Sequence, residues 1–337
     1  MHALQAGGAM HDVPLEDTSR IGQARRCAAQ LAEGLGFDEE DCGRVALVAT
    51  ELATNVLKHA GRGTFQVQPI AAEGGRGVEL IAVDGGPGFD FAACLADGMS
   101  TTGTRGIGLG AVARQAQVVD MYADTRGSVV MARMFPRQGA YRDLRYGASQ
   151  RSYGDETFCG DGWTVSFDEQ RRTAMLVDGL GHGALAHAAS LAAMRGFAEA
   201  DLRDPAMTVD AMHAEMCGTR GGAVGVATYD ERDGSLRFAG IGNISAALHS
   251  PEGTRGLASH PGIVGVQYRS ARAFDYTDAY GKLLILHSDG LQTRWSLANY
   301  PGLGLRHPAV IAAVLLRDFD RGRDDATVVV LALGDRR

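Results

Sequence analysis

Four aspartates stand at positions where a turn or the end of a strand would fix them. Asp178 and Asp289 each follow an apolar run and precede a glycine, Asp161 lies between two glycines, and Asp324 comes shortly before the apolar residues 328–331. Carboxylate oxygens are the ligands that hard divalent cations prefer, and carboxylates from separate strands can converge at one end of a sheet. The pattern therefore predicts a two-metal hydrolase site.

The grouping of these aspartates is what separates them from ordinary turn residues. Carboxylates held together without a cation repel one another, which raises their pKa, and a pair of divalent ions removes that penalty. Two such ions also acidify a bridging water and hold a phosphoryl oxygen in line for attack. Asp233-Gly234 lies between two strand-like runs and is interpreted only as a hairpin turn. His182 is interpreted as a structural neighbour of the site.

The first half carries residue types that suit a nucleotide. Glu51 and Asn55 are four apart and share a helix face, where they can orient a hydroxyl and ligate a magnesium ion bound to phosphates. Asp84 can accept a hydrogen bond from an exocyclic amine, and Gly86 and Gly88 behind it let a ring lie against the backbone.

A glycine-rich segment then precedes a helix, and free backbone amides at such a place form a phosphate cradle. Its candidate binding residues are Gly103, Arg105, Gly106, Gly108 and Gly110. Taken singly, a Glu/Asn pair is typical of a solvated helix face and alternating glycines are typical of a turn. The three features in this order, on a helix, a strand end and a loop before a helix, together predict an ATP site.

Two kinds of layer must position these residues. The first half alternates helices with strands, which predicts helices on one side of a mixed sheet; the helices are expected at 19–35, 38–60 and 111–115, and the strands at 64–70, 78–83, 118–123 and 129–135. The second half predicts two sheets packed face to face and covered by helices; its strands are expected at 163–167, 174–177, 223–229, 236–239, 246–249, 283–286 and 327–333, and its helices at 184–199, 207–217 and 309–318.

Composition narrows the class of protein. The 337 residues are enough for two domains, and 45% hydrophobic with 22% charged residues is typical of a globular protein. A net charge of −7 argues against nucleic acid or an anionic membrane as partner. There is no apolar run of membrane-spanning length and no signal-peptide pattern at Met1. Five scattered cysteines without a Cys-x-x-Cys pair indicate a reducing compartment, so we expect a cytoplasmic protein.

The nucleotide motifs resemble those of the GHKL ATP-binding fold. Residues 51–55 resemble its N box, residues 84–88 its first glycine box, and residues 103–110 its lid and second glycine box. Residues 49–63 are most similar to the RsbT branch of the anti-sigma-factor kinases. The resemblance covers approximately the first 135 residues and implies ATP with Mg as the bound nucleotide. It also implies a Ser/Thr kinase activity in which Glu51 is the general base.

The order of the acidic motifs resembles the PPM metal-dependent Ser/Thr phosphatases, in their SpoIIE and RsbX-like branch. Residues 177–183, 240–243, 288–290 and 324–327 carry that resemblance. It implies that Asp178 bridges two Mg or Mn ions and acts catalytically, that the Gly179 carbonyl and Asp161 bind one ion, and that Asp289 and Asp324 hold the other. Asp325, which follows Asp324 directly, is not assigned to either ion. An arginine clamp for phosphate near the first strand is not evident.

The expected fold is α+β, a GHKL (Bergerat-type) α/β layer followed by a PPM αββα sandwich. We expect the ATP-binding domain at 1–137, a linker at 138–142 and the phosphatase domain at 143–337. The resemblances imply phosphorylated STAS-domain proteins, or other components of an anti-sigma pathway, as partners. Two alternatives remain open: the first half is a non-catalytic ATP-sensing or partner-binding module, or the chain is a scaffold with both sites degenerate.

Overall fold

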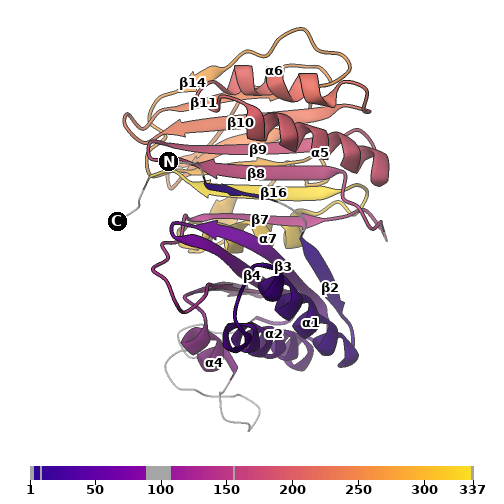
Figure 1. Ribbon diagram of the computed structural model, residues 1–337, viewed down its shortest axis with the longest axis vertical. Helices are drawn as coiled ribbons and strands as arrows, with labels where there is room; N and C mark the ends of the chain where they lie inside the picture. Colours follow the sequence, from indigo (N-terminus) through magenta and orange to yellow (C-terminus); the bar gives the residue numbers. More distant parts are fainter. Residues whose placement is uncertain (1–3, 8–9, 89–107, 155, 335–337) are drawn as a thin grey trace. The chain divides into compact units, whose positions relative to one another are not determined.

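In the computed structural model the chain forms two compact units, and their boundaries interleave along the sequence (Figure 1). The structure describes residues 4–7, 10–88, 108–154 and 156–334. The sandwich unit comprises Met1–Gly8, Arg145–Gly304 and Phe319–Arg337. The single-sheet unit comprises Ala9–Leu144 and Leu305–Asp318.

The single-sheet unit is built on five antiparallel strands in the order β2-β3-β4-β6-β5. The strands are β2 (His11–Leu15), β3 (Gly63–Ala72), β4 (Gly75–Asp84), β5 (Val118–Asp124) and β6 (Gly127–Met134). The helices are α1 (Ser19–Gly34), α2 (Glu39–Ala60), α4 (Gly108–Gln115) and α7 (Pro308–Phe319), the last of which belongs to this unit as far as Asp318. The predicted helices and strands of the first half therefore form one α+β layer.

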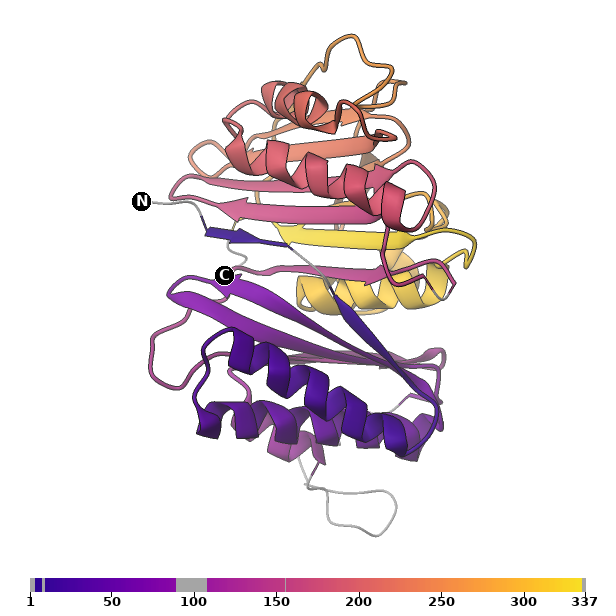
Figure 2. The same ribbon diagram turned by 45° about the vertical axis from the view of Figure 1, so that its right-hand side comes forward.

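Helices α1 and α2 lie side by side on one face of this sheet (Figures 1 and 2). Helix α2 starts where the sequence predicts it, because the Asp38 side chain accepts a hydrogen bond of 2.8 Å from the Asp41 amide. It ends at Gly61, which takes the left-handed conformation with φ of 75°. Its buried face, including Val48 and Leu52, packs into the core shared with α1 and the sheet.

On the sheet face away from the core shared with α1 and α2, strands β4 and β6 contribute residues to a buried charged network. Arg133 and Glu79 are fully buried, and Arg133 Nε donates to Glu79 Oε2 at 2.7 Å. Arg133 Nη1 also donates to Asp143 Oδ1 at 2.5 Å, and the His307 ring lies 2.9 Å from Asp143 Oδ2. His307 directly precedes α7, so these polar contacts tie the start of this helix to the single-sheet unit.

The sandwich unit consists of two antiparallel sheets, in the orders β1-β8-β9-β10-β11-β14 and β13-β12-β15-β16-β7. The first sheet contains β1 (Leu4–Ala6), β8 (Asp161–Phe167), β9 (Arg171–Gly179), β10 (Gly222–Asp230), β11 (Leu236–Ile241) and β14 (Phe274–Tyr276). The second contains β7 (Tyr146–Arg151), β12 (Ser245–Ser250), β13 (Gly253–Gly256), β15 (Leu283–His287) and β16 (Ala326–Ala332).

Two helices cover the first of these sheets, α5 (Ala184–Glu199) and α6 (Pro205–Met216) (Figure 1). Met175 and Val177 of β9 pack against α5 and α6 residues such as Ala189 and Met212 in one buried cluster. Strand side chains alternate between faces, so Leu176 of the same strand points to the other side of the sheet. This packing holds in place the end of β9, where Asp178 lies.

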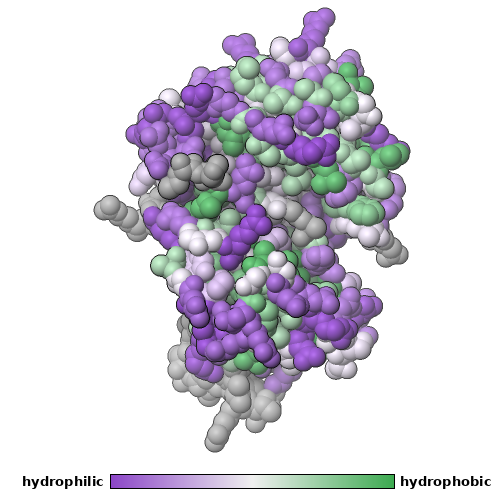
Figure 3. Space-filling model, viewed as in Figure 1, coloured by the Kyte–Doolittle hydropathy of each residue, from purple (hydrophilic) through white to green (hydrophobic). Residues whose placement is uncertain are grey.

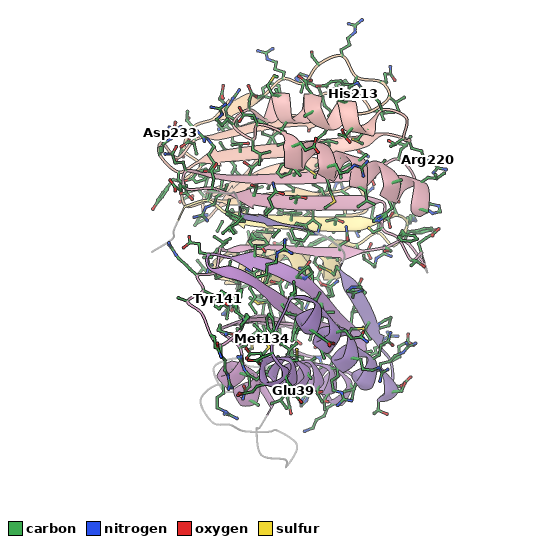
Figure 4. All side chains as sticks on the ribbon, in the orientation of Figure 1. Glu39, Met134, Tyr141, His213, Arg220 and Asp233 are labelled. Carbon is green, nitrogen blue, oxygen red and sulfur yellow. The ribbon has the colours of Figure 1, made fainter. Side chains whose placement is uncertain are left out.

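The compact units divide the chain differently from the expected domains at three places. Strand β1 pairs with β8 and so joins the sandwich unit, and residues 305–318 join the single-sheet unit. The expected linker at 138–142 packs on the single-sheet unit: Glu73 and Arg142 exchange backbone hydrogen bonds, and Tyr141 (labelled in Figure 4) stacks on Phe135 at 5.0 Å. Contacts across long sequence separations, which local patterns do not encode, set these boundaries.

Candidate active site

The ends of neighbouring strands bring the first two predicted metal ligands together. Asp161 begins β8 and Asp178 stands near the end of β9, and these two residues are direct partners across the antiparallel pair. Opposite residues in such a pair have their Cβ atoms about 5 Å apart. Two carboxylates at that spacing form the centre of the acidic cluster.

The two Asp-Gly turns need glycine for steric reasons. A Cβ atom at Gly179 would lie 2.3 Å from the carbonyl oxygen of Ala186, and one at Gly290 would lie 2.0 Å from the carbonyl oxygen of Asp325. Each glycine therefore lets another backbone segment approach the aspartate before it. Asp289 is held in place by Asn243, whose Nδ2 donates to Asp289 Oδ2 at 2.7 Å.

The adjacent aspartates of the last motif have different surroundings. Asp325 is 3% exposed and accepts hydrogen bonds of 2.7 Å from the amides of Tyr153 and Gly160. It thus fastens the start of β8 to the site, and both of its oxygens are occupied. Asp324 is only half-buried and accepts one bond of 2.9 Å from the Asp325 amide. This difference favours Asp324 as the ligand and Asp325 as a structural clamp.

Electrostatics show that the acidic residues converge. Burial, followed by the charges of Asp161, Asp289, Asp324 and Asp325, raises the pKa of Asp178 well above its usual range. The pKa of Asp161 is also raised, chiefly by burial and against the hydrogen bond from Ser288. The pKa of Asp289 is raised by burial and then by Asp324.

The donor set fits hard divalent cations. Asp161 is 4% exposed, Ser288 Oγ donates to its Oδ2 at 2.7 Å, and its Oδ1 has no hydrogen-bond partner among the described residues. A buried carboxylate oxygen without a partner is costly, and a cation would satisfy it. Among the described residues, no three His, Cys, Asp or Glu side chains already converge closely enough to hold a metal ion. An open cluster of oxygen donors suits Mg²⁺, which keeps several water ligands.

Two residues of this site were missed or left without a role by sequence reasoning. Ser288 connects the sheets, because its hydroxyl donates to Asp161 and accepts from the Thr327 amide at 3.0 Å. Its place directly before Asp289 was the available signal. Asn243 was noted only as part of a turn. His182 lies 3.1 Å from Glu156 and is half-exposed, which agrees with its interpretation as a neighbour of the site.

The described part of the predicted nucleotide site lies where α2 meets the end of β4. Glu51 and Asn55 are half-buried on α2, and Asp84 ends β4. Asp84 Oδ1 accepts from the Gly86 amide at 2.8 Å, and Ser128 Oγ donates to Asp84 Oδ2. A Cβ atom at Gly86 would lie 2.9 Å from Cβ of Ala60 near the end of α2.

The remaining glycines of the nucleotide motifs are placed only in part. Gly88 takes a left-handed conformation with φ of 73°, and Gly108 and Gly110 lie in the first turn of α4. Gly103, Arg105 and Gly106 lie outside the described residues. The phosphate cradle therefore stays a prediction.

Comparison with known proteins identifies the class of the first half. Residues 14–134 match the model of the histidine kinase-like ATPase domain. The serine/threonine-protein kinase RsbT of Bacillus subtilis (strain 168) is 38% identical over 95 residues, which are 28% of this chain and 71% of RsbT. The chain therefore belongs to the family of histidine kinase-like ATPases that includes RsbT.

The second half has its own relatives. The phosphoserine phosphatase RsbX of Bacillus subtilis (strain 168) is 24% identical over 143 residues, which are 40% of this chain and 69% of RsbX. One similar solved structure is described for the bacterial stressosome, a modular system adapted to control secondary messenger signalling. It is 27% identical with a TM-score of 0.51, and the match covers 56% of this chain and 99% of the chain in that structure. The chain thus combines a kinase-like ATPase domain with a second half that is similar in sequence to the phosphoserine phosphatase RsbX.

Proposed function

We propose that this protein is a metal-dependent protein Ser/Thr phosphatase whose N-terminal domain binds ATP and phosphorylates protein serine or threonine. The observation that carries the proposal is the acidic cluster around Asp178, whose pKa is raised by burial and then by four other carboxylates. Such a cluster is unfavourable without cations. Its chemistry is that of a hydrolase using two Mg or Mn ions.

We assign the metal ligands as the sequence predicted them. Asp178 would bridge both ions, with Asp161 and the Gly179 carbonyl on one and Asp289 and Asp324 on the other. When bound, the ions supply positive charge that acidifies a water molecule and neutralises phosphoryl oxygens.

The other polar residues hold these ligands in place. Ser288 orients Asp161, Asn243 orients Asp289, and Asp325 fixes the loop before β8 through two amides. These contacts keep the carboxylates in register before any substrate arrives, which is what positioning of this kind requires.

In the N-terminal domain, we assign Asp84 to the adenine ring, Asn55 to the magnesium ion of ATP, and Glu51 to activation of the acceptor hydroxyl. The half-buried positions of Glu51 and Asn55 on one face of α2 support this assignment. The glycines at the start of α4 would face the phosphates. If Glu51→Gln binds ATP and leaves phosphorylation unchanged, the domain acts as an ATP sensor and the kinase assignment is wrong.

The partners are proposed from the relatives. RsbT and RsbX are named as a kinase and a phosphatase, and the stressosome structure shares the fold. We infer phosphorylated STAS-domain proteins of a sigma-factor switch as substrates. Among the described residues no helix is both long and apolar enough to cross a membrane.

The decisive experiment incubates the purified full chain with candidate STAS proteins in phosphorylated and unphosphorylated form. Dephosphorylation should require Mn or Mg and should be lost in Asp178→Asn. Phosphorylation should require ATP and should be lost in Glu51→Gln. If Asp178→Asn retained wild-type turnover of p-nitrophenyl phosphate, the two-metal assignment would be wrong.

A further inference from the structure

Large apolar side chains are exposed beside the candidate metal centre. Phe158, Leu180 and Leu185 are 47%, 51% and 59% exposed, and together they are called the apolar rim. Phe158 lies three residues before Asp161, and Leu180 follows Gly179 directly. Leu185 lies in the first turn of α5. Figure 3 shows apolar surface on the side of the sandwich unit where α5 lies.

Contacts beneath the rim join the Phe158 loop to the start of α5. The Phe158 ring stacks on His187 of α5 with 5.2 Å between ring centres, and the His187 ring lies 2.9 Å from the carbonyl oxygen of Cys159. A Cβ atom at Gly160 would lie 2.8 Å from Cβ of Ala186. The loop before β8 and the start of α5 are therefore packed together.

A cation completes this surface. The Leu180 amide donates to the carbonyl oxygen of Gly221 at 2.9 Å, and a Cβ atom at Gly181 would lie 3.1 Å from Arg220 Nη1. Thr219 fixes the Arg220 loop, since its hydroxyl accepts from the Gly221 amide at 3.0 Å. Arg220 is exposed, and Figure 4 shows its side chain extending outward at the edge of the sandwich unit.

We propose that the apolar rim and Arg220 form the docking surface for the phosphoprotein substrate, an inference that rests on the proposed phosphatase function. The surface fits a segment with an apolar residue next to the phosphorylated serine or threonine and an acidic group that pairs with Arg220. Clustered exposed apolar side chains mark interaction surfaces, and a cation among them adds charge selection.

The position of the rim selects the substrate as its occupant. Leu180 is two residues from Asp178 and Phe158 is three residues from Asp161, so a protein segment that brings its phosphate to the metal centre arrives beside the rim. A stable partner at the same place would shut out every substrate. Covering the rim during each turnover instead removes water from around the reacting group and orients it.

The test uses the full chain with Mn and two synthetic phosphoserine peptides of equal length. One peptide has leucine on both sides of the phosphoserine, and the other has serine there. We expect the wild type to prefer the leucine peptide in kcat/KM by about tenfold, the scale that burial of one large apolar side chain gives. Phe158→Ser and Leu185→Ser should each reduce this preference severalfold. Leu191→Ser, an exposed leucine farther along α5, is the matched control and should retain it.

Three results would overturn the proposal. Equal kcat/KM for both peptides in the wild type would exclude apolar docking. An unchanged preference in both rim variants, each verified as folded by its thermal unfolding, would place docking elsewhere. A dimer that dissociates in Leu185→Ser without a change in preference would make the rim a contact between copies. Failure of the wild type to hydrolyse p-nitrophenyl phosphate would instead overturn the proposed function itself, and this separates the two conclusions.

Discussion

Replacement of Asp178 by asparagine should stabilise the metal-free protein while removing its response to metal. Burial and the neighbouring carboxylates raise the pKa of Asp178 from 3.8 to about 9. A carboxyl group whose pKa is raised on folding contributes fully below its unfolded pKa, and this contribution is lost progressively as pH rises from the unfolded pKa to the folded pKa. At pH 7 the native state must therefore keep this group protonated or hold a charge that repels its neighbours.

The size of the effect at pH 7 follows from the interval between the ordinary pKa of 3.8 and this pH. At 1.36 kcal/mol for each pKa unit, the cost at pH 7 is at most about 4 kcal/mol. Asparagine has nearly the same shape and needs no proton, so it recovers this energy minus the cost of any hydrogen bond its amide leaves unmade. We expect a gain of about 1 to 4 kcal/mol in the free energy of unfolding, and one that shrinks as pH falls toward 4.

Thermal unfolding in EDTA and in millimolar Mn measures both parts. The wild type should gain stability with Mn, by about 2.7 kcal/mol at a metal concentration of 100 times Kd. Asp178→Asn should start higher in EDTA and gain little. Asp233→Asn is the matched control, because Asp233 caps a turn in the same unit, where its pKa is lowered by hydrogen bonds from Ser235. A variant that is less stable than wild type in EDTA and responds normally to Mn would refute this reasoning.

Three further outcomes are expected. Asn55→Ala should abolish binding of a non-hydrolysable ATP analogue with Mg to the full chain in isothermal titration, and unchanged binding would remove Asn55 from the nucleotide site. Gly290→Ala should lower the free energy of unfolding, measured by denaturant titration, by about 2 kcal/mol or more, since its Cβ would lie 2.0 Å from a carbonyl oxygen. Gly43→Ala, in open space within α2, should instead raise it by up to about 1 kcal/mol in the same titration. The single-sheet unit should lose stability as pH falls below 6.5. Burial and Arg133 lower the pKa of His307, so the unfolded chain takes up the proton first. His307→Gln should flatten this part of the curve of unfolding free energy against pH, and an unchanged slope would contradict the assignment to His307.

Local patterns in the sequence predicted most of the elements that position the site. The capping aspartate and terminal glycine of α2 act over a few residues, and both ends of that helix were predicted from Asp38 and Gly61. The strands that carry Asp178 and Asp289 were equally visible, because their apolar runs end in Asp-Gly. These signals are encoded within one element, so one sequence is enough to read them.

Features that depend on distant partners were not predictable in the same way. Strand β1 is three residues long and is defined by its pairing with β8, about 160 positions later. Strand β7 follows the expected linker and gave no alternating pattern, since its residues through Gln150 are all buried. The separate roles of Asp324 and Asp325 depend on which amides point at each carboxylate, and the order of residues does not contain that information.

The membership of α7 changes how the two activities should be tested. A fragment that ends at residue 137 lacks Asp143 and residues 305–318, all of which belong to the single-sheet unit. In that fragment Arg133 would keep Glu79 but lose Asp143, and the contact between Asp143 and His307 would be absent. Breaking a buried ion pair by removing one partner costs about 3 to 5 kcal/mol. A failure of such a fragment to bind ATP would therefore report on its folding, and nucleotide binding must be measured on the full chain. The same argument predicts that residues 305–318 are required for a folded ATPase domain, even though they lie in the phosphatase half of the sequence.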